Sequence, residues 1–119
     1  MIKLQNVEKV YKSENGNVTA LNDINLEFES SGMVFVVGRS GSGKTTLLNI
    51  IGSLDHIDNG EVSVTFPNED EYNLSAASEK ELDEYRNLHV GFVFQEYNLL
   101  KDWNIRDNIL LPVRQQYTE

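Results

Sequence analysis

The sequence contains no cysteine, only two prolines and no long apolar run. The absence of cysteine excludes a disulfide scaffold and thiolate metal sites, and it suits a reducing compartment. A membrane span needs about 20 consecutive apolar residues, so the sequence predicts a soluble, cytoplasmic polypeptide. Basic residues are scarce, because ten Lys and Arg stand against nineteen Asp and Glu, for a formal charge of −9. No nucleic-acid partner is therefore expected, since such contact needs a basic face.

Most of the negative charge lies in one stretch, residues 58–84. This stretch holds nine acidic side chains and one basic side chain, Lys80, so the rest of the chain carries only −1. The acidic residues are Asp58, Glu61, Glu69, Asp70, Glu71, Glu79, Glu81, Asp83 and Glu84. Because runs of like charge usually face water, we expect this stretch to be exposed.

The apolar pattern predicts an α/β chain with strands of two kinds. Alternating apolar and polar residues predict half-buried strands at 2–7, 24–28 and 61–66, and turn-forming residues occupy 13–17 and 58–60. Continuous apolar runs at 33–37 and 89–94 predict strands buried on both faces, as in a parallel sheet covered by helices. The sequence therefore predicts an N-terminal antiparallel sheet followed by part of a parallel core.

Three helices are also expected. Apolar residues at helical spacing predict a helix over 45–54. Ser78, with Glu81 three residues later, forms a capping box that predicts a short helix ending near Asn87. Asn104 is expected to cap a last helix, 105–111, which Pro112 interrupts or ends.

The strongest motif lies between the first apolar run and the first helix. Residues 38–45 read Gly-Arg-Ser-Gly-Ser-Gly-Lys-Thr and match the phosphate-loop pattern G-x-x-x-x-G-K-[ST]. Glycines let the backbone N–H groups point into one concavity, and the helix dipole adds to the attraction for phosphate. In this pattern Lys44 supplies a charge for the β- and γ-phosphates, and the Thr45 hydroxyl is a ligand for Mg²⁺. The alternative is a glycine-rich turn with an exposed lysine.

A second candidate is Gln95, which follows the second apolar run. The carboxyl ends of parallel strands form the edge at which α/β sheets bind ligands. An amide there can coordinate Mg²⁺ through its oxygen and hydrogen-bond a water molecule. Gln95 is therefore a candidate catalytic and metal-binding residue.

With these motifs in order, the sequence resembles the nucleotide-binding domain of ABC transporters, in the branch that exports macrolides, lipoproteins and antimicrobial peptides. The likeness lies in residues 10–26, 37–55, 78–100 and 104–112. It implies an α/β fold with a partial P-loop NTPase core and an N-terminal antiparallel β subdomain. It also implies the ATP-binding portion of an ATPase that couples ATP binding and hydrolysis to transport.

The resemblance assigns roles to matching residues. Tyr11 takes the place of the aromatic residue that stacks on adenine, and the alternative is a half-buried tyrosine of the sheet. Gln95 takes the place of the glutamine that touches Mg²⁺ and the attacking water. Tyr97–Lys101 match the segment that meets the transmembrane permease, although an ordinary surface loop is the alternative. The residues implied to bind ATP are Tyr11, Gly38, Ser40, Gly41, Ser42, Gly43, Lys44, Thr45 and Thr46, with Thr45 and Gln95 as metal ligands and Lys44 and Gln95 as catalytic residues.

Elements that the family needs for hydrolysis do not occur after Gln95. No Ser-Gly-Gly, no apolar run ending in Asp-Glu and no histidine follows it, so the helical subdomain, signature loop, Walker B and switch histidine are absent. We therefore expect residues 1–119 to be the N-terminal part of one ATPase domain, unable to hydrolyse ATP alone. The intact protein would lie at the inner face of the cell membrane with a permease and a second ATPase domain.

Two departures from the family pattern stand out. Arg39 replaces a small residue or proline and is expected to face solvent, and the acidic segment 67–73 puts the local hairpin in doubt. His56 and His89 are expected at the surface or at a strand edge, and Trp103 is expected to be a packing residue. Two other classes remain open: another P-loop enzyme, such as a nucleotide kinase or GTPase, and an interaction module without catalysis.

Overall fold

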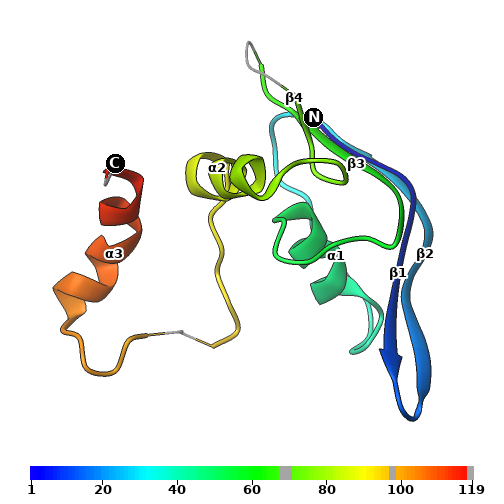
Figure 1. Ribbon diagram of the computed structural model, residues 1–119, viewed down its shortest axis with the longest axis horizontal. Helices are drawn as coiled ribbons and strands as arrows, with labels where there is room; N and C mark the ends of the chain where they lie inside the picture. The colour runs from blue at the N-terminus through cyan, green and yellow to red at the C-terminus, as the bar shows by residue number, and fades with distance from the viewer. Residues whose placement is uncertain (68–70, 97–98, 118–119) are drawn as a thin grey trace.

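A computed structural model describes residues 1–67, 71–96 and 99–117, with side chains in the last stretch only as far as Val113. The elements, in order, are β1 (Ile2–Ser13), β2 (Gly16–Phe28), α1 (Lys44–Ile51), β3 (Asn59–Thr65), β4 (Glu71–Asn73), α2 (Glu79–His89) and α3 (Ile105–Tyr117). Figure 1 shows α1 and α2 on one side of a curved sheet, and α3 apart from it.

The sheet has the order β2-β1-β3-β4, and all neighbouring strands are antiparallel. β1 and β2 form one long hairpin that closes at Ser13 and Gly16, inside the expected turn. β3 and β4 form a second hairpin in which Val64 lies opposite Tyr72. The antiparallel subdomain is confirmed, and the doubt about this second hairpin was wrong, since its strands pair on both sides of the acidic connection.

The core lies between the sheet and the two helices. α1 and α2 contribute an apolar stripe each, and the strands contribute the residues of the facing side. The buried residues are Leu4, Val7, Leu21, Leu47, Ile50, Val62, Val64, Leu74, Leu82 and Tyr85. This core fixes α1, and with it the start of the phosphate loop's helix, against β1 and β2.

The N-terminus of α2 carries the expected capping box. The Ser78 side chain accepts a hydrogen bond from Glu81 N at 3.3 Å, and Glu81 Oε2 accepts one from Ser78 N at 2.7 Å. The Ser78 hydroxyl also donates to Glu81 Oε2 at 2.9 Å, and the two hydrogen bonds donated to this carboxylate, first the backbone one and then the hydroxyl one, hold the pKa of Glu81 below its ordinary value. The helix continues to His89, two residues beyond the predicted end.

α2 also holds the end of α1. The Tyr85 hydroxyl donates to Ile51 O at 2.7 Å, and Arg86 Nη1 donates to Ser53 O at 2.7 Å. These donors satisfy carbonyl groups at a helix C-terminus, which otherwise have no partner. Burial of the phenol raises the pKa of Tyr85 to about 12.

The two apolar segments, residues 33–37 and 90–94, do not form the predicted strands. Phe35 is 79% exposed and Val93 is fully exposed. A buried parallel strand needs neighbouring strands to bond with on its edges, and neither segment pairs with any described strand. Val90 is partly buried against the core, and Phe92 packs inward against Gly52 at the end of α1. Both strand predictions were therefore wrong for this chain.

α3 begins at the predicted cap but does not end at the proline. Asn104 Oδ1 accepts from Asp107 N at 2.8 Å, and the helix runs through Pro112 to Tyr117. Proline removes one backbone hydrogen bond, but the helix forms and continues past it. The prediction that Pro112 interrupts or ends this helix was wrong.

The chain as a whole is more open than a compact domain. Its radius of gyration is 16.1 Å, against about 13.5 Å expected for a compact chain of this length. α3 lies away from the sheet (Figure 1). In the part of the chain that the structure describes, no helix has the length and apolar character needed to cross a bilayer.

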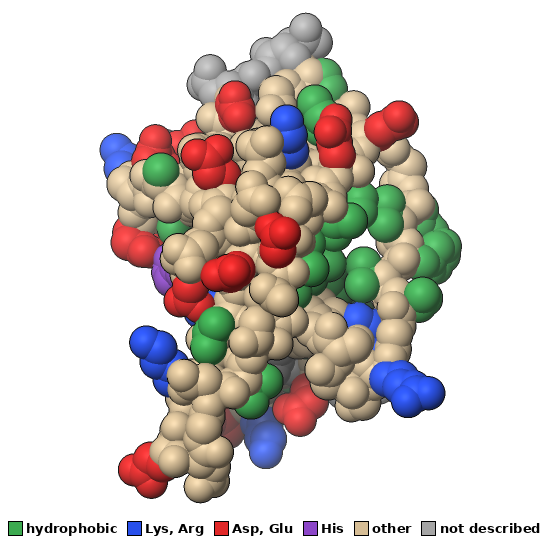
Figure 2. All heavy atoms as spheres, turned by 90° about the vertical axis from the view of Figure 1, so that its right-hand side faces the viewer, with side chains coloured by type: hydrophobic (Ala, Val, Ile, Leu, Met, Phe, Trp, Pro, Cys, Tyr) green, Lys and Arg blue, Asp and Glu red, His purple; other side chains and the backbone are tan. Residues whose placement is uncertain are grey.

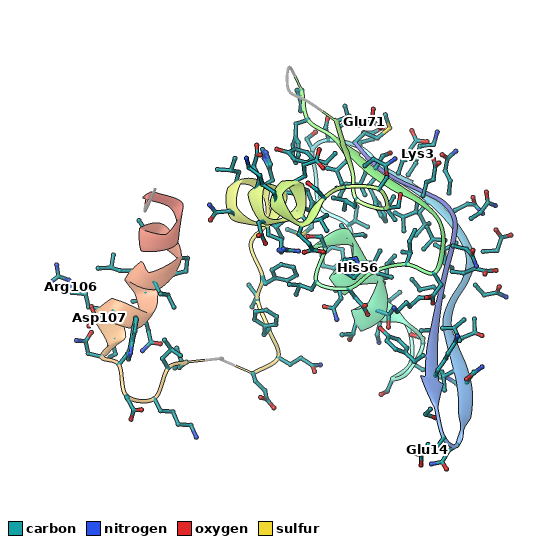
Figure 3. The ribbon with its side chains drawn as sticks, in the orientation of Figure 1. Lys3, Glu14, His56, Glu71, Arg106 and Asp107 are labelled. Atoms are coloured by element: carbon teal, nitrogen blue, oxygen red, sulfur yellow. The ribbon has the colours of Figure 1, made fainter. Side chains whose placement is uncertain are left out.

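The acidic stretch lies at the surface. Each of its described acidic residues is exposed, which confirms the expectation for them, while Glu69 and Asp70 lie outside the described residues. Figure 2 shows acidic side chains spread over one face and apolar ones gathered around a hollow beside them. Figure 3 places Glu71 at the upper end of the sheet and Glu14 at the tip of the long hairpin.

Candidate nucleotide-binding site

The phosphate-loop sequence forms a tight turn directly before α1. Ser42 N donates to Arg39 O at 3.1 Å, and α1 then begins at Lys44 with Gly43 as its N-cap. Gly41 and Gly43 have φ angles of 79° and 94°, in the left-handed region that favours glycine. Arg39 is exposed, as expected.

The surroundings of Gly43 also leave no room for a side chain. A Cβ atom at Gly43 would lie 2.5 Å from Ala20 O, whereas one at Gly41 would meet nothing within 4 Å. The loop therefore passes close to β2, and only a residue without a side chain fits at that crossing. No side chain caps the first turn of α1, so its backbone N–H groups remain available.

A pocket of about 470 Å³ opens beside this loop. Its volume lies within the range of small-molecule sites. Its lining comes from three separate parts of the sequence: the long hairpin, the loop with the first turn of α1, and the segment after residues 90–94. The lining residues are Tyr11, Val18, Ala20, Ser40, Gly41, Gly43, Lys44, Thr45, Thr46 and Gln95.

The pocket brings together most of the predicted site residues. Tyr11, Lys44, Thr45 and Gln95 all face one space, although Tyr11 and Gln95 are 84 positions apart in the sequence. Gly38 and Ser42 are not part of the lining. Gly38 instead lies behind the loop, where its carbonyl accepts a hydrogen bond from Lys44 Nζ and its Cα faces Ser42 Oγ.

Gln95 reaches the pocket without the strand that was expected to carry it. It is exposed and lies in a bend after residues 90–94. Phe92, two residues before that segment's end, is anchored on Gly52 and stacks with Phe94 at 5.5 Å between ring centroids. Gln95 thus lies at the pocket, but the predicted strand before it does not form.

The electrostatics of the pocket differ from those of the whole molecule. Among the described lining residues none is acidic, and Lys44 carries a positive charge. The chain as a whole has a formal charge of −9. The lining offers backbone N–H groups, which can donate hydrogen bonds to phosphate oxygens. It also offers the hydroxyl oxygens of Ser40, Thr45 and Thr46 and the amide oxygen of Gln95, which are ligands of the kind that a hard cation accepts.

Tyr11 takes part in a network that the sequence reasoning missed. Its hydroxyl donates to Asp55 Oδ2 at 2.7 Å and lies 3.5 Å from Thr46 Oγ1. Lys9 Nζ pairs with Asp55 Oδ1 at 3.3 Å and stands over the Tyr11 ring, 5.2 Å from its centroid. The alternation of Lys9 and Tyr11 along β1 was a signal that these two side chains share a face, but nothing local indicated Asp55.

The pKa of Asp55 reflects these contacts. Burial raises it, but hydrogen bonds from Tyr11, from the His56 backbone N–H and from Lys9 outweigh burial, with the charge of Lys9 adding to them. The pKa of Asp55 is therefore below its ordinary value of 3.8, and the group is a carboxylate at neutral pH.

An apolar surface lies at the start of α3, away from the pocket. A space of about 400 Å³ is lined by Leu99, Leu100, Lys101, Trp103, Ile105, Asn108 and Ile109. Trp103 is 44% exposed and Ile109 is 68% exposed, so Trp103 packs only in part. Tyr97 and Asn98, the first residues of the predicted permease segment, lie outside the described residues.

The two histidines differ in their surroundings. His56 is exposed and lies 4.0 Å from Glu79, beside α1 (Figure 3), as expected of a surface residue. His89 is partly buried, and its ring stacks on Phe66 with 4.0 Å between centroids. Neither residue lines the nucleotide pocket.

Known proteins are similar to this chain in sequence. The bacitracin export ATP-binding protein BceA of Halalkalibacterium halodurans is 37% identical over 95% of the chain and 43% of the relative. The lipoprotein-releasing system ATP-binding protein LolD of Bacteroides fragilis is 40% identical over 94% of the chain and 48% of the relative. The chain thus spans about half, or less, of the length of these curated relatives.

A solved structure agrees over the whole chain. The ATP-binding cassette MJ0796, in a dimeric post-hydrolysis state bound to ADP and Pi, matches with a TM-score of 0.88 and 38% identity, over 100% of the chain and 49% of that structure. This match supports the α/β P-loop NTPase fold with an N-terminal β subdomain. The ABC transporter family model matches residues 21–119, and the chain belongs to this family.

Proposed function

We propose that the chain is the ATP-binding portion of the ATPase of an ABC exporter, which couples ATP binding and hydrolysis to transport across a membrane. The observation that carries this proposal is the pocket that joins Tyr11, the phosphate loop and Gln95 from distant parts of the sequence. A glycine-rich turn alone would not require an aromatic side chain and an amide to line the same space.

Each part of the pocket has a role in the proposal. The Tyr11 ring, 41% exposed and beside Val18 and Ala20, offers a flat surface on which adenine stacks. The loop's N–H groups and the first turn of α1 hold the phosphates. Lys44 leaves the Gly38 carbonyl and contacts the β- and γ-phosphates.

Thr45 and Gln95 would hold Mg²⁺, because a hydroxyl and an amide oxygen are ligands of the kind that this ion accepts. When bound, Mg²⁺ neutralises charge on the phosphates. Gln95 would in addition orient a water molecule through its amide group. Both side chains line the pocket, so they can act on the same phosphate group.

The chain alone is proposed to bind ATP weakly and not to hydrolyse it. Phosphoryl transfer needs a group that positions the attacking water, together with further charge stabilisation. Among the described lining residues, Lys44 is the single charged group and none is a carboxylate. In this proposal residues 1–119 are the N-terminal part of one ATPase domain, and the remaining groups belong to the other half of that domain and to a second one.

The apolar surface at the start of α3 is proposed to meet the permease. Leu99 and Ile105 are 63% and 80% exposed, and large exposed apolar patches mark interaction sites. The same proposal places the intact protein at the cytoplasmic side of a membrane, as a dimer of ATPase domains.

The experiment is a titration of the chain with MgATP, compared with Lys44→Ala. We expect Lys44→Ala to weaken binding by about tenfold or more, because a hydrogen-bonded charge is worth roughly 1.5–3 kcal/mol. Lys101→Ala removes an equal charge far from the pocket and should leave the affinity unchanged. Equal affinity of the wild type and Lys44→Ala would instead favour a purely structural role.

A further inference from the structure

The hydroxyl of Tyr11 is held by a residue outside the nucleotide pocket. Tyr11 Oη donates to Asp55 Oδ2 at 2.7 Å, and Asp55 lies just after α1, whereas Tyr11 is on β1. Asp55 does not line the pocket, so it has no direct access to a bound nucleotide. Any effect of Asp55 on the base must pass through the tyrosine.

Asp55 is itself fixed from three sides. Its Oδ1 accepts a hydrogen bond from His56 N at 2.8 Å and pairs with Lys9 Nζ at 3.3 Å. Its backbone N–H donates to Asn49 O, 3.3 Å away, at the end of α1. The Asp55 side chain is 28% exposed and that of Lys9 is 13% exposed, so both are largely shielded from solvent. A carboxylate held in this way is a rigid acceptor for the phenol.

Lys9 occupies one face of the tyrosine ring. Its Nζ lies over the ring, 5.2 Å from the centroid, and Lys9 is not part of the pocket lining. A cation over one face of an aromatic ring is favourable and blocks that face. The base would then stack on the opposite face, toward Val18 and the phosphate loop.

We propose that Asp55, together with Lys9, is a positioning residue for adenine, holding the Tyr11 ring in a fixed orientation and tying it to the helix that begins at Lys44. This inference rests on the proposed function, since it assumes that Tyr11 stacks on the base. The ionised state of Asp55 supports it, because a carboxylate is a stronger acceptor for the phenol than a neutral acid. Preorganised groups bind more tightly, since less entropy is lost when the ligand arrives.

The test compares two probes that share the phosphate site and differ in the base. MgATP needs both Tyr11 and the loop, whereas inorganic tripolyphosphate with Mg²⁺ needs the loop alone. The dissociation constants of both probes are measured by NMR titration of the 119-residue chain, which tolerates weak binding. The variants are Asp55→Ala, Tyr11→Phe and Lys44→Ala, and circular dichroism checks that each is folded.

The expected result is a loss of base preference. Asp55→Ala and Tyr11→Phe should each weaken MgATP binding by about three- to tenfold, because each keeps the ring and loses only part of the stacking on the base. Tripolyphosphate binding should remain within twofold of the wild type, which a general loss of structure would not allow. The ring NMR signals of Tyr11 should also shift in Asp55→Ala before any ligand is added.

Asp58→Ala is the matched control. Asp58 Oδ2 accepts from Val10 N at 2.7 Å, so this change also removes a carboxylate that anchors β1, directly beside Tyr11. It should leave the ratio of the two affinities unchanged. An equal fall of the ratio in Asp58→Ala and Asp55→Ala would overturn the inference, because any loosening of β1 would then suffice.

The outcomes separate this inference from the proposed function. If the wild type binds both probes, Lys44→Ala loses both, and Asp55→Ala and Tyr11→Phe keep the wild-type ratio, the inference is wrong and the proposed function stands. If Asp55→Ala does not fold, Tyr11→Phe decides alone, because it removes a single oxygen and keeps the ring. If the wild type binds neither probe, both proposals fail.

Discussion

Two regions of this chain both carry large apolar side chains, but one region buries them and the other leaves them exposed. In the antiparallel sheet, Leu4 is 1% exposed and Val62 is 1% exposed beneath α1 and α2. In the two apolar segments, Val37 is 87% exposed and Val93 is fully exposed. The difference lies in where each strand finds its partner. Hairpins supply partners close in the sequence, whereas buried parallel strands depend on neighbours brought from elsewhere.

The comparison has a functional side. The nucleotide pocket is built mainly by the long hairpin and the loop that begins α1. Among the described lining residues, Gln95 alone follows residues 90–94, whereas the loop residues follow 33–37. Binding of the base and phosphates should therefore rely on the sheet, while the role of Gln95 should depend on how residues 90–94 are held.

The largest expected effect is the contrast between core truncations in the two regions. Leu4→Ala should lower the free energy of unfolding by about 2–5 kcal/mol, since it leaves a cavity in a packed core. Phe35→Ala should change it by no more than about 0.5 kcal/mol, because that side chain is 79% exposed. Urea denaturation followed by circular dichroism measures both. Similar losses for the two variants would show that residues 33–37 are packed.

The next effect concerns the crossing of the phosphate loop and β2. Gly43→Ala combines a left-handed φ with a Cβ 2.5 Å from Ala20 O, whereas Gly41→Ala has the strained φ alone. Strain of this kind costs roughly 1–2 kcal/mol. Gly43→Ala should therefore lose more stability than Gly41→Ala, and it should also lose tripolyphosphate binding. If the two variants were equally stable, the close approach of the loop to β2 would be refuted.

A smaller effect is the loss of folding stability at acid pH that Asp55 causes through its contacts with β1. The pKa of Asp55 is lowered in the folded chain, so its stabilisation is present above the ordinary value of 3.8 and is lost as pH falls through the folded pKa. Unfolding in urea at about pH 6 and about pH 3 measures this loss. Asp55→Ala should show a shallower fall than the wild type, and an identical fall in both would contradict the contacts with Tyr11 and Lys9.

Local signals explain what could be predicted from the sequence. The turn at residues 13–17, the capping box of Ser78 and the cap at Asn104 each depend on neighbouring residues, and all three were confirmed. The phosphate-loop pattern placed Lys44 and Thr45 at the start of α1 for the same reason. In such features the interacting residues are close together in the sequence, so a local pattern is enough to predict them.

The misses share the opposite property. Whether residues 33–37 pair depends on strands that the pattern of those residues does not specify. The hydrogen bond between Tyr11 and Asp55 joins residues 44 positions apart in the sequence, so no local motif predicts it. Pro112 was expected to interrupt or end α3, but the helix continues to Tyr117. Its start is secured by Asn108 Nδ2, which donates to Leu100 O and Trp103 O, both at 3.2 Å. That anchoring could not be inferred from the proline rule.

The most direct test is hydrogen–deuterium exchange of the chain with and without MgATP, followed by mass spectrometry. We expect β1–β3 to be protected and residues 33–37 to exchange rapidly in both states. Added MgATP should slow exchange at residues 40–46 and in the hairpin around Tyr11, and Lys44→Ala should abolish that slowing at the loop. Unchanged exchange at residues 40–46 under saturating MgATP would contradict the assignment of this pocket as a nucleotide site.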